Sequence, residues 1–329
     1  WKLSGRTLSL PPPELLRLFG PAPAPSLLVP GSPPAPALPA GSRMPFRRSP
    51  LLVGRACELQ WLAQLFEAAT LVAITGMGGL GKTQLAIEFV HRYGPSFAGG
   101  AFWLSFADPA GVPAELAACG GAGHLDLRPN FGHLPLDQQA ELVQAAWATG
   151  TPRLLVFDNC EDEALLARWL PVTGGCRVLL TSRRAQWDAG LGLQALPLAP
   201  LEQAASVQLL RQHGVADGSA AELGAIATAV GNLPLALHLA GSFLAHYARL
   251  VPPACYLAQL QELQGDRLGA LIQHRSLHDS GAPGRRHDLE HSFALSYDRL
   301  DPRDPTDALA QALLARATYF APGEPLARD

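Results

Sequence analysis

The sequence contains almost no lysine. Two lysines, Lys2 and Lys82, stand among 25 basic residues, and all the others are arginines. Where an arginine-using chain keeps a lysine, we expect the chemistry to require it, because a compact ammonium group fits between phosphate oxygens where a planar guanidinium does not. Neither lysine follows an asparagine. The guanine-reading motif Asn-Lys-x-Asp is therefore absent, which argues against a GTPase.

The sequence also lacks paired cysteines, a long apolar run and a strong charge of either sign. Its five cysteines are scattered without a Cys-x-x-Cys pair, as expected for reduced thiols of a cytoplasmic protein. The longest strongly apolar helical stretch, residues 233–245, contains His238 and is too short to span a bilayer. No charged stretch followed by an apolar core opens the chain, so no secretory leader is expected. With a net charge of −3 and no basic stripe, this segment is expected to bind neither nucleic acid nor membranes directly.

Composition divides the 329 residues into four predicted parts. Residues 1–50 hold 13 of the 30 prolines and are predicted to be a largely disordered linker, with a ligand for a proline-binding module as the alternative. Residues 51–199 alternate short apolar runs with helical patterns, which predicts an α/β fold with a parallel sheet covered by helices. Residues 200–280 read as helices alone. Residues 281–329 read as the start of a further helical unit, so we expect a piece of a longer protein.

The apolar pattern also predicts individual elements. Short unbroken apolar runs predict strands at 71–75, 101–106, 153–158, 176–182 and 193–198. Helical spacing of apolar residues predicts helices at 58–69, 82–93, 201–214, 219–231, 233–247 and 253–263.

One glycine-rich segment carries the strongest chemical signal. Residues 76–83, GMGGLGKT, match the phosphate-loop (Walker A) pattern Gly-x-x-x-x-Gly-Lys-Thr between a predicted strand and a predicted helix. Glycines let successive backbone N–H groups turn toward an anion, and the helix start adds its positive dipole end. Lys82 is expected to reach the β- and γ-phosphates, and the Thr83 hydroxyl to bind Mg²⁺.

Two further strand ends are expected beside this loop. The run RLLVFD ends in Asp158, a carboxylate that can hold Mg²⁺ near a phosphate loop. The run CRVLLTS is followed by Arg183, which is either a sensor of the γ-phosphate or an ordinary solvated residue. Asn159 directly follows Asp158 and cannot take a proton from water, so the rate of any hydrolysis stays open.

Two groups of titratable residues allow more than one interpretation. Glu161, Asp162 and Glu163 could supply a catalytic base, but a solvated helix start is the simpler interpretation. Two pairs of histidines within residues 274–291 have metal-compatible spacing, yet no cysteine or close carboxylate cluster completes a site there.

Taken together, these segments resemble the NB-ARC family of STAND ATPases, the signalling switches of plant immune receptors, apoptotic scaffolds and many bacterial regulators. The segment LLVGRACELQWL is similar to the family's opening motif, and GMGGLGKTQLA to its phosphate loop. LLVFDN resembles the family's Mg²⁺ strand, VLLTSR its first sensor, and GNLPLAL its GLPL motif. The resemblance implies a P-loop sheet in residues 51–199, a helical (ARC-type) domain in 200–280, and a truncated winged-helix domain in 281–329.

The resemblance also implies a binding site for ATP or ADP with Mg²⁺. The implied nucleotide-binding residues are Val53, Gly54, Arg55, Gly76, Gly78, Gly79, Leu80, Gly81, Lys82, Thr83, Gln84 and Pro234. Val53, Gly54, Arg55 and Pro234 would lie near the adenine, and the others around the phosphates. The implied catalytic residues are Lys82, Asp158 and Arg183, and the implied Mg²⁺ ligands are Thr83 and Asp158.

The function implied by the resemblance is a regulatory switch. ADP would hold a closed monomer, ATP would permit an open homo-oligomer, and hydrolysis would be slow. An effector before this segment and a sensor after it, both in the same polypeptide, would be its partners. Two alternatives stay open: a scaffold that never turns its nucleotide over, and a phosphotransferase, which would need an arginine-rich lid that the sequence does not show.

Overall fold

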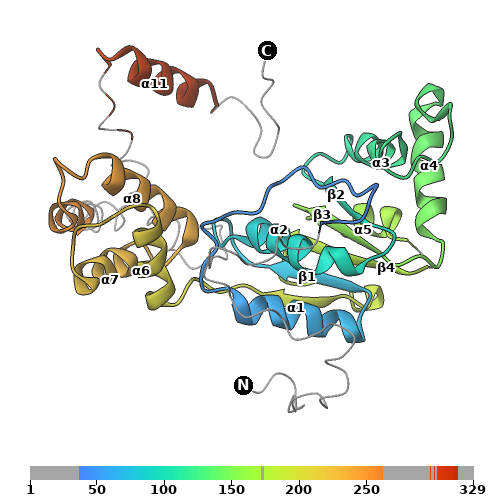
Figure 1. The fold of residues 1–329 in the computed structure, drawn as a ribbon, viewed down its shortest axis with the longest axis horizontal. Helices are drawn as coiled ribbons and strands as arrows, with labels where there is room; N and C mark the ends of the chain where they lie inside the picture. The colour runs from blue at the N-terminus through green and yellow to red at the C-terminus, as the bar shows by residue number, and fades with distance from the viewer. Residues whose placement is uncertain (1–36, 172–173, 262–296, 298–299, 301, 318–329) are drawn as a thin grey trace, which may run out of the picture.

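The fold is taken from a computed structural model of the chain (Figure 1). It describes residues 37–171, 174–261, 297, 300 and 302–317. Most of the predicted proline-rich linker, the histidine pairs within 274–291 and most of the predicted winged-helix segment therefore lie outside the described residues.

The core of the protein is a parallel sheet, as predicted. Its strands pair in the order β2-β3-β4-β1-β5. They are β1 (Leu71–Thr75), β2 (Ala101–Ser105), β3 (Arg153–Asp158), β4 (Cys176–Ser182) and β5 (Gln194–Pro197). Every residue of β1 is buried, which fits a strand covered on both faces. Because all strands run in the same direction, their carboxyl ends meet at one edge.

Helices cover both faces of this sheet. Successive strand residues alternate between the two faces: Leu154 and Val156 pack on one side, and Leu155 and Phe157 on the other. The first side is covered by α1 (Ala56–Ala68) and α2 (Lys82–Tyr93). The second side is covered by α3 (Val112–Gly120), α4 (Leu136–Trp147) and α5 (Glu163–Trp169), which the sequence had not delimited.

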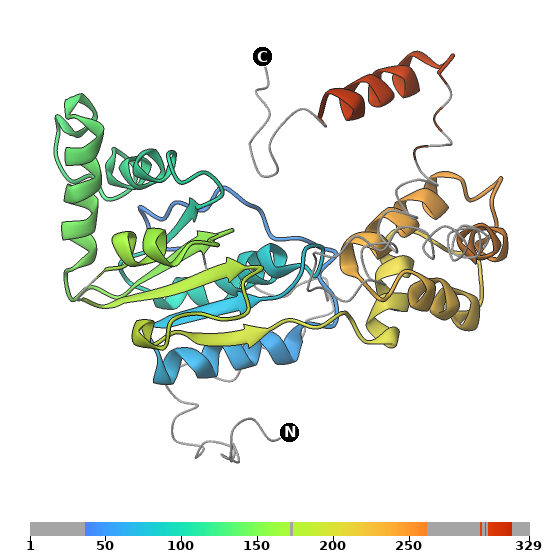
Figure 2. The same cartoon turned by 180° about the vertical axis from the view of Figure 1, so that it is seen from behind.

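Only helices follow β5 in the described residues. They are α6 (Gln203–Gln212), α7 (Ala220–Ala229), α8 (Pro234–His246), a helical stretch at 253–261, and α11 (Pro305–Ala317). In Figure 2 the arrowheads of β4 and β5 point toward the group formed by α6, α7 and α8. The apolar cluster on the α1–α2 side of the sheet continues into these helices, so the two parts share one core. None of the helices that the structure describes is long and apolar enough to cross a membrane.

Residues 37–50 differ from the linker prediction, because they pack against the edge of the sheet. Arg43 pairs with Phe102 of β2 as an isolated parallel bridge, with Arg43 N–H donating to the Ala101 carbonyl at 2.8 Å. The Phe46 ring lies edge-on to Trp103 at 5.1 Å. β2 is an edge strand with unpaired backbone groups that a passing segment can satisfy. The high proline count of residues 1–50 as a whole predicted a linker throughout. Residues 40–44, however, contain no proline and can pair with the edge strand.

A buried carboxylate fixes the end of this segment to α2. Glu88 is only 4% exposed at its side chain and accepts hydrogen bonds from Arg48 Nε at 2.8 Å and Arg48 Nη2 at 2.6 Å, and another from Arg92 Nε. Burial opposes ionisation of Glu88, but the hydrogen bonds from Arg48 and Arg92 outweigh it and lower the pKa of Glu88 below its ordinary 4.5. The folded state therefore favours the ionised form.

Replacing Glu88 should destabilise the fold in a pH-dependent way. Glu88→Gln leaves Arg48 and Arg92 without their anion, and we expect a loss of about 3 kcal/mol at pH 7, near the low end for broken buried pairs because both arginines reach solvent. Since the folded-state pKa is depressed, this stabilisation is present above pH 4.5 and lost as the pH falls through the folded-state pKa. Urea unfolding from pH 7 downward measures it, with the exposed Glu67→Gln as control. A difference between wild type and variant that stays constant below pH 4 would contradict this prediction.

Candidate nucleotide-binding site

The phosphate loop connects β1 to α2 at the carboxyl edge of the sheet. Gly76, Gly79 and Gly81 adopt positive φ values of 144°, 81° and 85°, a backbone region that side chains disfavour. Gly81 is the N-cap of α2, so the loop ends at the positive end of the helix dipole. Beside the loop lies a cavity of about 480 Å³. Its lining comprises Ser49, Leu51, Leu52, Val53, Arg55, Gly78, Gly79, Leu80, Gly81, Lys82, Thr83, Gln84, Asn159, Thr181, Arg183, Leu201, Leu209, Pro234, Leu235 and His238.

Lys82 lies back over the loop that precedes it. Its Nζ donates to the carbonyl oxygens of Gly76 at 2.7 Å and Met77 at 2.9 Å. Burial and the positive charge of Arg183 lower the pKa of Lys82, while Glu161 and Asp158 oppose the shift. Lys82 and Arg183 thus form a region of concentrated positive charge in the cavity, as an anionic ligand requires.

Asp158 joins two strands to the phosphate helix. Its Oδ1 accepts hydrogen bonds from Thr83 Oγ1 at 3.0 Å and from Thr181 Oγ1 at 2.6 Å. Burial raises the pKa of Asp158, and the hydrogen bonds from Thr181 and Thr83 oppose the shift. Asp158 does not itself line the cavity, whereas both threonines do.

These groups are chemically suited to Mg²⁺, which is commonly held by one or two protein oxygens together with phosphate and water. Thr83 and Asp158, the two predicted ligands, provide a hydroxyl and a carboxylate oxygen in direct contact. No cluster of three or more His, Cys, Asp or Glu side chains suited to a metal occurs in the part of the chain that the structure describes. A site built only from protein side chains is therefore not found there.

Arg183 and Asn159 both line the cavity, at the ends of neighbouring strands. Asn159 adopts a left-handed backbone with φ of 61°, which asparagine tolerates better than most residues, and its N–H donates to Thr181 Oγ1 at 2.9 Å. The position directly after Asp158 thus places an amide, not a carboxylate, at the cavity wall.

Arg55, in the segment that resembles the family's opening motif, is hydrogen-bonded to the phosphate loop. Arg55 is 4% exposed, and its guanidinium donates to the Leu80 carbonyl at 3.2 Å, the Ala199 carbonyl at 2.8 Å and Glu58 at 2.7 Å. Although Arg55 lines the cavity, three of the five N–H donors of its guanidinium are therefore engaged by the protein. The Arg55 guanidinium thus joins α1, the phosphate loop and the segment that leads into α6.

Gly54 has a packing role rather than a place in the cavity wall. Its φ is 66°, and a Cβ added there would lie 2.4 Å from the Ala205 Cβ of α6. Val53, by contrast, is buried and lines the cavity. With Leu51, Leu52, Leu201 and Leu209 it forms an apolar wall.

Helix α8 rests directly on the phosphate loop. Pro234 occupies its first turn and lines the cavity, while the adenine contact implied by the GLPL-like motif stays a prediction. The next backbone N–H, of Leu235, donates to the Gly79 carbonyl at 3.2 Å. Residues far apart in the sequence, from Ser49 to His238, thus line one cavity.

Sequence reasoning missed several lining residues. His238 stands out, because its Nδ1 contacts His213 Nε2 at 3.1 Å. Burial and the neighbouring His238 lower the pKa of His213. Nothing in the sequence pairs the two histidines.

No protein-family model matches the chain. Among curated proteins, the regulatory protein AfsR of Streptomyces coelicolor is 30% identical over 207 residues, which cover 58% of this chain and 21% of AfsR. The regulatory protein AfsR of Streptomyces griseus is 33% identical over 179 residues, covering 53% of this chain and 18% of that protein. The chain thus spans about a fifth of the length of these relatives.

The comparison with solved structures found matches over most of the chain at low scores. The Walker-type ATPase PABY2304 of Pyrococcus abyssi has a TM-score of 0.44 at 13% identity, over 84% of this chain and 91% of that chain. A STAND protein with a tetratricopeptide repeat sensor from Pyrococcus horikoshii has a TM-score of 0.38 at 17% identity, over 84% and 47%. Drosophila ORC bound to DNA has a TM-score of 0.46 at 13% identity, over 86% and 83%. All three scores lie below 0.5, and the fold is established by the chain's own strand order and phosphate loop.

The expectation of a P-loop ATPase fold is confirmed by the parallel five-stranded sheet, the loop between β1 and α2, and the helices that follow β5. Over more than half of its length, the chain is also similar to proteins that are named regulatory proteins.

Arg55 offers a direct test of the support for the loop. Arg55→Met keeps the length of the side chain but leaves Glu58 and two backbone carbonyls without their donor. We expect a loss of about 2–3 kcal/mol in unfolding free energy, measured by urea denaturation. Arg47→Met, at an exposed arginine, is the matched control and should change stability by less than about 0.5 kcal/mol. Equal stability of the two variants would refute this role for Arg55.

Proposed function

We propose that this chain, which has a P-loop ATPase fold and resembles the STAND class, is a regulatory switch operated by ATP and ADP. One observation carries the proposal: a single cavity is lined both by the phosphate loop and by the start of α8, and the two are hydrogen-bonded through Leu235 N–H and the Gly79 carbonyl. A ligand in such a cavity contacts both parts of the protein at once. Its phosphates can therefore influence how the helices sit on the sheet.

In this proposal the phosphates occupy the N–H-lined loop and Lys82 turns from the Gly76 and Met77 carbonyls toward the β- and γ-oxygens. Thr83 and Asp158 would hold Mg²⁺, and the cation would neutralise charge on those oxygens. The apolar wall around Val53, together with Pro234, receives the adenine. The wall carries few polar groups, so it supports a base better than a polar acceptor substrate.

Switching requires a contact that differs between the two nucleotides. Only ATP carries a γ-phosphate, and Arg183 is the cavity-lining arginine at the end of β4. A ligand shifts an equilibrium only by its difference in affinity for the two states, and such couplings are typically about 5- to 150-fold. We propose a closed monomer with ADP and an open homo-oligomer with ATP, as the NB-ARC resemblance implies.

Slow hydrolysis fits the polar groups around Asp158. Asp162 caps α5 by accepting from the N–H groups of Ala164 and Leu165, while Glu161 and Glu163 are engaged by the segment after β4. Asn159 offers no carboxylate. Glu161, Asp162 and Glu163 are thus engaged in structural contacts, and no free carboxylate is left beside Asp158 in this segment to act as a base. This favours slow turnover, or the alternative of a nucleotide-dependent scaffold without turnover.

The output of the switch is proposed from the relatives. Both AfsR proteins are named regulatory proteins, and this chain matches about a fifth of each. We propose that an effector and a sensor in the same cytoplasmic polypeptide use the state of this segment. Neither nucleic acid nor a membrane is proposed as a direct partner of the segment itself.

The proposal predicts that bound nucleotide depends on Lys82. Wild-type protein, denatured after purification, should release ADP or ATP, identified by chromatography. Lys82→Ala should abolish binding of added nucleotide, and Lys82→Arg should also weaken it at least about tenfold despite its equal charge, because a guanidinium does not fit between the phosphates as an ammonium does. Absence of bound nucleotide, together with no binding of added ATP or ADP by wild type, would refute the proposal.

Turnover is a separate prediction. Multiple-cycle phosphate release by wild type should be slow, and Asp158→Ala should reduce it at least about tenfold, because the Mg²⁺ site loses a carboxylate. Asp137→Ala, on the exposed first turn of α4, should leave the rate unchanged. Equal release from all three proteins would mean that this chain does not hydrolyse ATP and would favour the scaffold alternative.

A further inference from the structure

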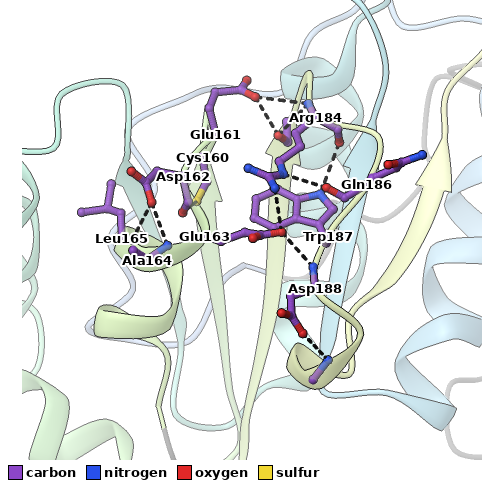
Figure 3. Close-up of polar contacts among 12 residues, drawn as sticks. Cys160, Glu161, Asp162, Glu163, Ala164, Leu165, Arg184, Gln186, Trp187 and Asp188 are labelled. Atoms are coloured by element: carbon purple, nitrogen blue, oxygen red, sulfur yellow. Dashed lines mark hydrogen bonds and ion pairs between the residues drawn. The ribbon is translucent and has the colours of Figure 1, made fainter.

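The segments that follow β3 and β4 carry opposite charges and meet beside the cavity. Glu161, Asp162 and Glu163 follow β3, and Arg183 and Arg184 follow β4. Figure 3 shows Glu161 and Glu163 directed across to the segment that contains Arg184, Trp187 and Asp188, whereas Asp162 accepts hydrogen bonds from its own helix start. Because β3 and β4 are neighbours in the sheet, the two segments leave it side by side.

Glu161 accepts hydrogen bonds from the backbone at the end of β4. Its carboxylate accepts from Ser182 Oγ at 2.9 Å, from Arg183 N–H at 2.8 and 3.1 Å, and from Arg184 N–H at 3.2 Å. Hydrogen bonds to an ionised acceptor are about twice as strong as neutral ones. Four contacts from one carboxylate therefore fix the course of the chain where the two arginines emerge.

Arg184 is directed away from the cavity by a second set of contacts. Its Nη2 pairs with Glu163 at 3.0 Å, its Nε donates to the Gln186 carbonyl at 2.7 Å, and its guanidinium lies over the Trp187 ring at 5.5 Å (Figure 3). Glu163 also accepts from Asp188 N–H at 2.8 Å. The Arg184 guanidinium is thus engaged by Glu163, Gln186 and Trp187.

Arg183 has the opposite surroundings. It lines the cavity, and no ion pair to its guanidinium is found within the described ranges. The residue before it, Ser182, is fully buried, and its carbonyl accepts from Gly76 N–H at 3.2 Å at the start of the phosphate loop. The backbone that Glu161 holds is therefore joined directly to the loop.

We propose that Glu161 is a positioning residue that presents Arg183 to the γ-phosphate. By fixing the backbone between Ser182 and Arg184, it determines which of two adjacent arginines faces the cavity. The inference rests on the proposed nucleotide switch, and it names a residue that helps this switch to distinguish ATP from ADP. Glu161 itself does not line the cavity, so it acts through Arg183 rather than on the ligand.

The test compares affinities for ADP and for the non-hydrolysable analogue AMP-PNP, both with Mg²⁺, by calorimetry on the whole chain. Glu161→Gln keeps the shape but sets an amide NH₂ against backbone donors. It should lower AMP-PNP affinity about five- to tenfold, the loss of a charge-assisted hydrogen-bond set, and leave ADP affinity within about twofold. Glu163→Gln is the matched control, because it loosens Arg184 and the Asp188 N–H but makes no contact with Arg183, and it should leave both affinities within about twofold.

A double-mutant cycle separates positioning from general structural support. Arg183→Ala should lower AMP-PNP affinity at least as much as Glu161→Gln. In the Arg183→Ala background, Glu161→Gln should have no further effect, because the two residues act as one unit. Additive losses would overturn the inference, as would an unchanged AMP-PNP affinity in Glu161→Gln. Loss of ADP affinity together with a lowered thermal midpoint in Glu161→Gln would assign Glu161 to folding and would also overturn it.

Failure of the underlying proposal has a different signature. If wild type binds neither nucleotide, or if Arg183→Ala leaves the affinities for both unchanged, the switch itself is refuted in proteins whose Glu161 is intact. If Arg183→Ala selectively weakens AMP-PNP while Glu161→Gln does not, the switch stands and only the role of Glu161 falls.

Discussion

The carboxylate of Asp158 is the interaction on which the site depends. It joins Thr83 at the start of α2 to Thr181 near the end of β4, so three elements distant in sequence are held at one edge of the sheet. The parallel strand order makes this possible, because it brings the carboxyl ends of β1, β3 and β4 together. The hydroxyl and carboxylate expected to hold Mg²⁺ are thus already in contact with each other.

Helix α8 closes the other side of the cavity. The hydrogen bond from Leu235 to Gly79 and the close packing of Ala205 against Gly54 place the helical part directly on the nucleotide-binding part. Both contacts involve positions that only glycine suits well, since Gly79 and Gly54 have positive φ and lie against neighbouring residues. A movement of the helices relative to the sheet would therefore break the hydrogen bond between Leu235 and Gly79 of the phosphate loop, and the proposed switch relies on this contact.

Local sequence predicted the elements whose signal is local. The five strands, α2 and the phosphate loop were placed within a few residues, because unbroken apolar runs and a glycine-rich loop are properties of short segments. Arg55 as a brace, Glu161 as a backbone clamp and the packing of residues 37–50 were not predicted. Each depends on contacts between residues far apart in the chain, such as Arg55 with Ala199, and no single segment carries that information. The lone internal lysine was informative because its scarcity is a property of the whole chain.

The central claim is that the nucleotide controls the contact between the phosphate loop and α8. Hydrogen–deuterium exchange of this chain, followed at residues 76–83 and 231–237 with ADP and with AMP-PNP, tests it most directly. Both nucleotides should slow exchange at 76–83, whereas protection at 231–237 should differ between them because only one carries a γ-phosphate. Equal protection at 231–237 by both nucleotides would contradict the account.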